Sequence, residues 1–98
     1  MTITFSQHVT APEDVLVRIL DGEAVLLNLD TESYFGLDDV GARMWTLLTK
    51  SDSIQAAYDA LLEEYDVAPE QLRADLTDLI VRLVNHGLIT LETHDTMA

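Results

Sequence analysis

The 98-residue sequence contains no cysteine, which excludes disulfide bonds and thiolate metal sites. Only five residues are basic against eighteen acidic ones, and the resulting net charge of −13 would repel nucleic-acid phosphates and an anionic membrane surface. No apolar run approaches the roughly 20 residues that span a bilayer. The N-terminus MTITFSQH lacks the basic and long apolar segments of a signal peptide. We therefore expect a cytoplasmic protein with neither a nucleic-acid nor a membrane partner.

Motifs for catalysis and cofactor binding are also missing. His8, His86 and His94 lack the spacing to one another, or to clustered carboxylates, that a metal site needs. The serines lie in expected turns without a nucleophile-elbow motif, and there is no GxGxxG or P-loop pattern. So short a chain also has little room for a deep pocket of about 300 Å³ or more. We expect no metal, no cofactor and no enzymatic activity.

The composition predicts one folded domain. Hydrophobic residues make up 48% of the chain, which is enough for a single core and argues against disorder. No internal repeat, low-complexity segment or linker divides the sequence. We expect one domain over residues 1–98, with its core within about residues 15–92.

The N-terminal half predicts an antiparallel sheet. The apolar segments 15–20 and 23–29 flank Asp21-Gly22, the pair typical of a two-residue type I′ hairpin turn. A polar turn over 30–33 leads to a third short strand over 34–37. Near the N-terminus, Ile3 and Phe5 alternate with polar residues, which indicates a short edge strand.

The C-terminal half predicts three helices. Asp38 is suited to cap the first helix, in whose interior Gly41 implies close contact with the sheet. Asp52 and Gln55 resemble a capping box that begins the second helix.

The third helix and the residues after it complete the predicted fold. This helix is expected over Pro69 to His86, and Gly87 is its expected left-handed stop. Residues 88–92 suggest a last short strand or an extended tail, and residues 93–98 look frayed. The order predicts an α+β, winged-helix-like domain: a three-stranded antiparallel sheet followed by three helices, with a short C-terminal strand.

The third strand would lie at an edge of this sheet. An open edge can accept an extended peptide as an additional strand, and a glycine such as Gly36 permits close backbone approach. The third helix would form the floor of the peptide groove, with charged side chains to orient a guest. The residues themselves leave an alternative, in which Tyr34, Phe35 and Leu37 are ordinary core residues and the edge is covered. An open edge could also pair with a second copy and form a homodimer.

Two further functions fit the predicted topology. In a winged-helix DNA-binding protein the third helix would read DNA, but its mixed charges form no basic face. An acidic, non-catalytic subunit that stabilises a basic partner enzyme would fit the net charge.

The segment AVLLNLDTESYFGLDDVGARMWTLL, residues 24–48, resembles the signature region of the PqqD family. That family has an apolar strand, a turn, a "YFxL" strand and a helix with "GARIW". A "P-E-x-x-x-x-D-L" opening over residues 69–76 and "G-L-I" over 87–89 also match, so the resemblance spans about residues 15–92. Ser33 stands where a glycine often ends the turn, and Asp38 where an asparagine often opens the helix. The sequence is closer to a generic or lasso-peptide type than to the dedicated pyrroloquinoline quinone form.

The resemblance implies a leader-peptide-binding protein, also called a RiPP recognition element. Such proteins serve in the biosynthesis of ribosomally synthesised, post-translationally modified peptides. They bind the leader of a precursor peptide and deliver it to a modifying enzyme, such as a leader peptidase or a radical SAM enzyme. In the family the leader adds as a strand to the third strand beside the third helix. Carried to this sequence, the resemblance implies nine peptide-binding residues: Tyr34, Phe35, Gly36, Leu37, Asp75, Leu76, Leu79, Arg82 and Leu83.

Overall fold

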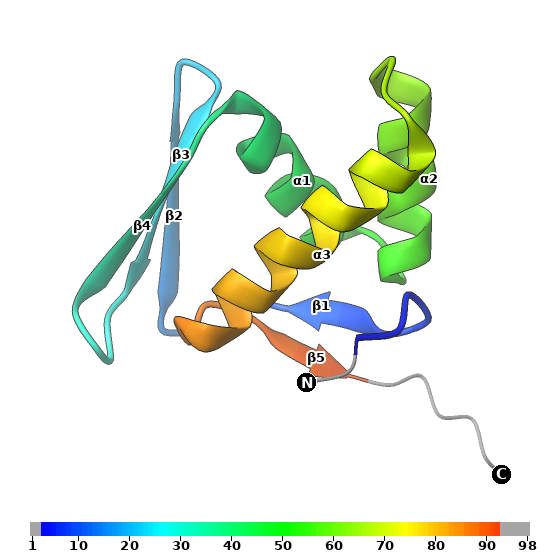
Figure 1. Cartoon of the computed structure of the whole chain (residues 1–98). Coiled ribbons are helices and arrows are strands. Elements are labelled where there is room, and N and C mark those ends of the chain that lie inside the picture. Colours follow the sequence, from blue (N-terminus) through cyan, green and yellow to red (C-terminus); the bar gives the residue numbers. More distant parts are fainter. Residues whose placement is uncertain (1–2, 93–98) are drawn as a thin grey trace, which may run out of the picture.

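Figure 1 shows the computed structural model of the chain, which describes residues 3–92. The expected fraying of residues 93–98 lies outside the described residues. Five strands and three helices follow one another along the described chain: β1 His8–Thr10, β2 Val15–Leu20, β3 Glu23–Asn28, β4 Ser33–Leu37, α1 Asp39–Lys50, α2 Ile54–Glu64, α3 Pro69–Asn85 and β5 Thr90–Glu92. The predicted α+β architecture is therefore confirmed.

Strands β2, β3 and β4 form an antiparallel sheet in that order. Asp21 and Gly22 join the first two strands with φ angles of 53° and 85°, as a type I′ turn requires. The register places Leu26 opposite both Val17 and Phe35. Because β4 pairs with β3 alone among the described strands, β4 is an edge strand, as predicted.

The first and third helices begin where the sequence predicted, and α3 ends one residue before its predicted end. The Asp38 carboxylate accepts a hydrogen bond of 2.8 Å from the Gly41 amide at the start of α1. A Cβ on Gly41 would lie 3.2 Å from the Leu37 side chain, so this glycine does contact the end of β4. The capping box predicted for α2 is wrong, because Ser53 caps that helix by accepting from the Ala56 amide at 3.1 Å.

The N-terminal segment differs from the prediction. Residues 3–5 are not a strand, and the first strand is β1, which pairs antiparallel with β5. The carbonyl groups of Phe5 and Gln7 accept hydrogen bonds of 2.8 Å from the Gln55 and Ile54 amides, respectively. These amides belong to the first turn of α2, where intrahelical acceptors are lacking. The backbone at residues 5–7 therefore pairs with a helix terminus instead of a sheet.

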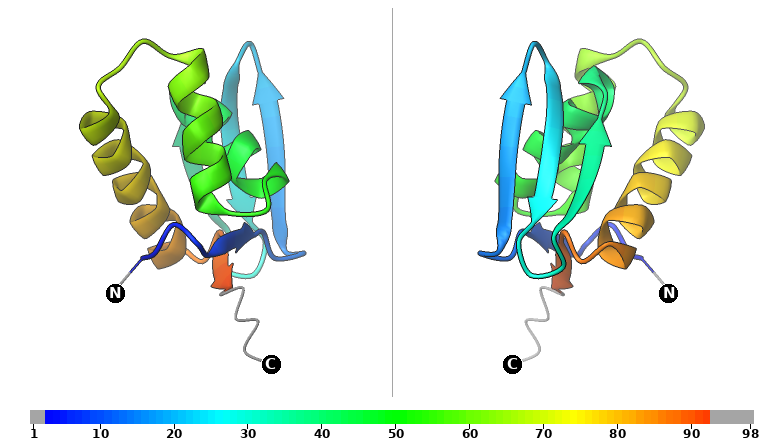
Figure 2. Two further views of the ribbon diagram at one scale, coloured as in Figure 1. Left: turned by 90° about the vertical axis from the view of Figure 1, so that its right-hand side faces the viewer. Right: turned by 90° about the vertical axis from the view of Figure 1, so that its left-hand side faces the viewer.

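The core lies between the helices and one face of the β2–β4 sheet. Its largest fully buried side chains come from β3, from all three helices and from the segment after α3: Leu26, Leu48, Ile54, Leu61, Leu76, Ile80, Leu83 and Leu88. The right-hand view of Figure 2 shows the three strands in front of the helices, with nothing over their outer face. No helix within residues 3–92 is both long and apolar enough to span a membrane.

Candidate functional site: a groove between β4 and α3

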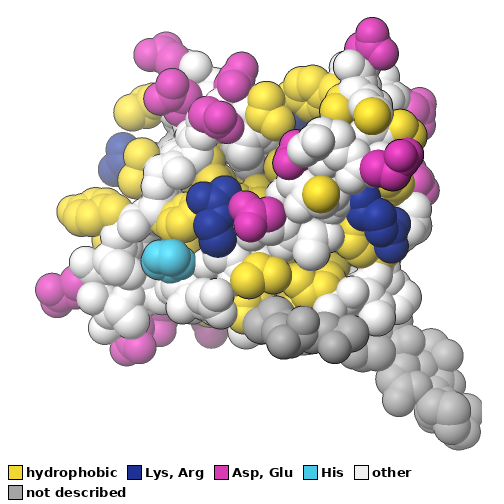
Figure 3. Space-filling model, in the orientation of Figure 1, with side chains coloured by type: hydrophobic (Ala, Val, Ile, Leu, Met, Phe, Trp, Pro, Cys, Tyr) yellow, Lys and Arg dark blue, Asp and Glu magenta, His cyan; other side chains and the backbone are white. Residues whose placement is uncertain are grey.

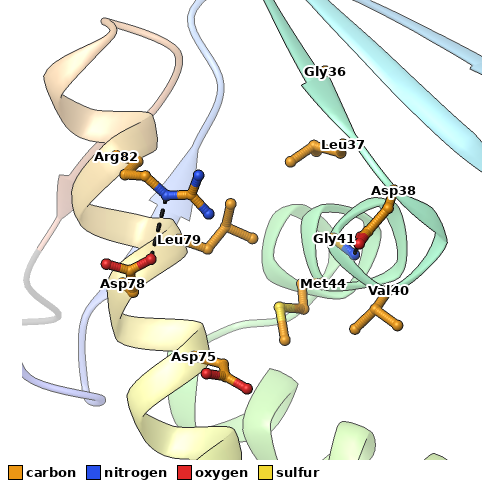
Figure 4. A pocket seen from close by; sticks show the side chains of 10 residues that line it. All are labelled: Gly36, Leu37, Asp38, Val40, Gly41, Met44, Asp75, Asp78, Leu79 and Arg82. Carbon is orange, nitrogen blue, oxygen red and sulfur yellow. Dashed lines mark hydrogen bonds and ion pairs between the residues drawn. The ribbon is translucent and has the colours of Figure 1, made fainter.

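A groove of about 340 Å³ separates the end of β4 and the start of α1 from helix α3. Figure 4 shows its lining from close by, with the strand and α1 on one side and α3 on the other. The ten lining residues are Gly36, Leu37, Asp38, Val40, Gly41, Met44, Asp75, Asp78, Leu79 and Arg82. Because β4 is an edge strand, backbone groups border this groove on one side.

The side chains of β4 alternate between two environments. Leu37 is buried in the core, and Phe35 is half-buried and packs against the core. Tyr34 is 73% exposed and pairs with Leu27 on the outer face of the sheet. The alternative that all three are ordinary core residues therefore fails for Tyr34.

Gly36 is not required by the packing of the protein itself. Its Cβ position has no heavy atom of the described chain within 4 Å, and its backbone is not in the left-handed region. A larger, more strand-favouring residue would therefore fit in the free protein. Because side chains alternate along β4, this open Cβ position lies on the outer face of the sheet with Tyr34 and Val25, and the Gly36 backbone lines the groove.

Helix α3 presents a charged wall with an apolar base. Asp75, Asp78 and Arg82 recur at helical spacing, and the Arg82 Nε atom lies 3.3 Å from an Asp78 carboxylate oxygen. The Arg82 guanidinium carbon lies 5.7 Å from the centre of the Phe35 ring, which His86 also contacts edge-on at 5.0 Å between ring centres. This end of the groove thus combines a cation with aromatic surface.

The structure brings together most of the sequence-predicted site, but not all of it. Gly36, Leu37, Asp75, Leu79 and Arg82 line the groove, and Phe35 lies beside Arg82. Leu76 and Leu83 do not reach it, because both side chains are fully buried in the core. Both belong to the hydrophobic core and do not offer a surface to a guest.

The sequence reasoning missed the contribution of α1 to the groove. Val40 and Met44, one helical turn apart, line it from the strand side. The signal was present, since a helix that begins two residues after a strand must place its first turn beside the end of that strand. Their helical spacing alone marks both residues only as members of an apolar stripe.

Asn28 at the end of β3 joins the sheet to the end of α3. Its side chain is 5% exposed, and its Nδ2 donates a 3.0 Å hydrogen bond to the Gly87 carbonyl. Its Oδ1 accepts from the Asp30 amide at 2.9 Å and the Thr31 amide at 3.3 Å. This one side chain therefore ties the turn before β4 to the residue that ends α3, and it helps to set the relative position of the two groove walls.

Other surface features are less suited to bind a ligand. A wider depression of about 600 Å³ on the far side of α3 is lined by that helix alone, so it is a helix surface and not a cleft. Within residues 3–92, no group of three or more histidine and acidic side chains could hold a metal ion. A third depression of about 290 Å³ lies between the hairpin end of β2, helix α1 and Tyr65, beside the other edge of the sheet. The groove between β4 and α3 is the one that brings together residues of the sequence-predicted site.

Comparisons with known proteins point to the same region. The family model described as "Coenzyme PQQ synthesis protein D (PqqD)" matches residues 23–89, which include both walls of the groove. A solved structure described as "TbiB1 in Complex with the TbiA(beta) Leader Peptide" superposes with a TM-score of 0.76 and 35% sequence identity. The superposition covers 91% of this chain and 98% of that one. The comparison with curated proteins found no significant match.

Proposed function

The chain belongs to the PqqD family, as its sequence resemblance implied, and we propose that it binds the leader segment of a precursor peptide. The peptide would be one that is ribosomally synthesised and then modified by another enzyme. One observation carries this proposal: the open edge of β4 borders a groove in a fold shared with a leader-bound relative.

The leader binds as an additional strand along β4. Main-chain groups on the free edge of β4 supply hydrogen bonds that do not depend on the leader's side chains. The missing side chain at Gly36 leaves room on the outer face of the sheet for a bulky leader side chain beside it, which accounts for a glycine where the free protein needs none. Leu37, Leu79 and Met44 provide an apolar base for side chains of the leader.

The charged side chains of α3 add selectivity along the groove. Arg82, near the Phe35 ring, favours an acidic or aromatic leader side chain at its end of the groove. Asp75, towards the start of α3, favours a basic or polar group at the other end. Leu76 and Leu83 act only by supporting the helix, since their side chains are buried.

The protein itself performs no chemistry in this proposal. It holds the leader while an enzyme such as a leader peptidase or a radical SAM enzyme acts on the rest of the precursor. DNA binding is disfavoured, because α3 alternates acidic and basic side chains and the net charge is −13. Homodimer formation through β4 would occupy the same edge and would compete with the leader.

Isothermal titration against synthetic leaders of precursor peptides encoded beside this gene tests the proposal. We expect saturable binding of one leader per chain, with slower hydrogen exchange of backbone amides within residues 34–37 in the complex. Binding that protects α2 and leaves β4 unchanged would contradict strand addition. A folded protein that binds none of these leaders would contradict the function.

A matched pair of arginine variants tests the groove. Arg82→Gln is expected to weaken leader binding about two- to fivefold, the range for a single exposed ionic contact. Arg73→Gln makes the same change on the same helix, but Arg73 stacks on Phe5 outside the groove, 4.1 Å from the ring centre. Equal losses in both variants, with unchanged melting temperatures, would place the leader elsewhere.

A further inference from the structure

The outer face of the β2–β4 sheet carries an apolar surface that no part of the described chain covers. The register places Leu16, Leu27 and Tyr34 side by side in one row across the three strands. Val25 follows in the next row, and Leu20 follows at the hairpin end of β2. We call these five residues the outer sheet face. The right-hand view of Figure 2 looks onto it, and hydrophobic side chains project at the left margin of Figure 3.

Four of these five side chains are unusually accessible for their type, and Leu27 is partly buried. Leu16 is 49% exposed, Leu20 68% and Val25 42%, in addition to the exposed Tyr34. Single exposed apolar residues are common, but a contiguous apolar surface on one sheet face marks an interaction site. The sheet faces the helices with its other side, so this surface contributes nothing to the core.

Acidic residues lie at both ends of the outer sheet face. Asp21 and Glu23 lie at the hairpin end, and Asp14, Asp30 and Glu32 lie at the opposite end, all exposed. Arg18, the one basic side chain on the three strands, lies within the face itself, opposite Val25 and between Leu16 and Leu20. A second copy of the chain would bring two such acidic rims together at a net charge of −13 each, which disfavours self-association through this face.

We propose that the outer sheet face docks the enzyme that modifies or cleaves the bound precursor, through an enzyme surface that is apolar at its centre and basic at its rim. The apolar centre would cover the leucines and Val25, and the basic rim would meet the acidic ends of the sheet. This inference rests on the proposed leader binding for the identity of the partner, but not for the surface itself.

The position of this face relative to the groove suits such a partner. The groove opens beside the edge of β4, whereas the enzyme would lie against the outer side of the sheet, so both can be occupied together. A leader strand added beside β4 would extend the sheet next to Tyr34. The docked enzyme would then lie next to the chain that it processes.

Two variants of β2 test the proposal, because neighbouring positions on this strand point to opposite sides. Leu16→Gln changes the outer sheet face, whereas Ile19→Gln alters a side chain of similar exposure, 55%, on the inner side. The probes are the purified candidate peptidases and modifying enzymes encoded beside this gene, tested one at a time by biolayer interferometry. Leader affinity and melting temperature are measured on the same preparations.

We expect one enzyme to bind the wild-type protein and to bind more weakly at higher salt. Leu16→Gln should reduce its affinity at least about fivefold, while Ile19→Gln leaves it unchanged. Leader affinity should be the same in both variants. Equal enzyme affinity in both variants, no enzyme binding by the wild type, or a wild-type dimer that Leu16→Gln dissociates would each overturn the proposal. If the wild-type protein binds no leader, that result would instead contradict the proposed function.

Discussion

Replacement of Asn28 tests how the two walls of the groove are held together. Asn28→Ala removes the donor to the Gly87 carbonyl and the acceptor for the Asp30 and Thr31 amides. The side chain is 5% exposed, so water does not readily replace these partners. The variant should therefore lose stability and also loosen the connection between the turn before β4 and the end of α3.

The magnitude follows from the lost hydrogen bonds. At about 1 kcal/mol for each of the contacts at 2.9 and 3.0 Å, and less for the third at 3.3 Å, the free energy of unfolding should fall by roughly 2–3 kcal/mol. For a domain of this size the melting temperature should then fall by about 10–20 °C. Asn28→Asp keeps the acceptor of the turn but directs a carboxylate oxygen at a carbonyl, so it should cost at least as much.

Thermal and urea unfolding, followed by circular dichroism, measure the effect. Thr31→Ala is the control, because it leaves the Thr31 amide in place and removes only an exposed hydroxyl contact with Ser33. We expect that control to change stability by less than about 0.5 kcal/mol. An Asn28→Ala variant as stable as Thr31→Ala would show that the turn before β4 does not depend on the Asn28 side chain.

Four further changes have defined outcomes. Gly87→Ala should destabilise the protein by about 1–2 kcal/mol in urea unfolding, because its φ is +70°. Glu32→Gly should raise the free energy of unfolding by roughly 0.5–1 kcal/mol, since Glu32 adopts a φ of 58°, and an unchanged value would contradict this. Gly36→Val should leave the melting temperature unchanged or higher, yet weaken leader binding in titration calorimetry. The hydrogen bond from Arg43 lowers the pKa of Glu64. The wild-type protein should therefore be more stable than Glu64→Gln at neutral pH, and this difference should disappear as pH falls through the lowered pKa of Glu64. Melting curves from pH 7 to pH 2 would check this.

The local elements of the fold could be predicted because their signals lie within a few residues of one another. Asp21-Gly22 favours a type I′ turn through the two residues themselves. Gly87 ends α3 because glycine adopts the positive φ of a helix stop without strain. The predicted strand at Ile3 and Phe5 was wrong because the contacts that decide its structure are distant in the sequence. The acceptor groups of that segment pair with the first turn of α2, some 50 residues away, and local alternation carries no information about it.

The hairpin, the order of strands and helices, the acidic charge and the family can be read from the chain alone, because these depend on short-range backbone preferences and on residue order. Which side chains of α3 face β4 depends instead on how the helix packs. Periodicity places Leu76, Leu79 and Leu83 on one stripe, but Leu79 alone among them lines the groove. The role of Asn28 was likewise hidden, since its partner Gly87 lies 59 residues away along the chain. Long-range contacts of this kind arise from how the layers pack, and no local pattern records them.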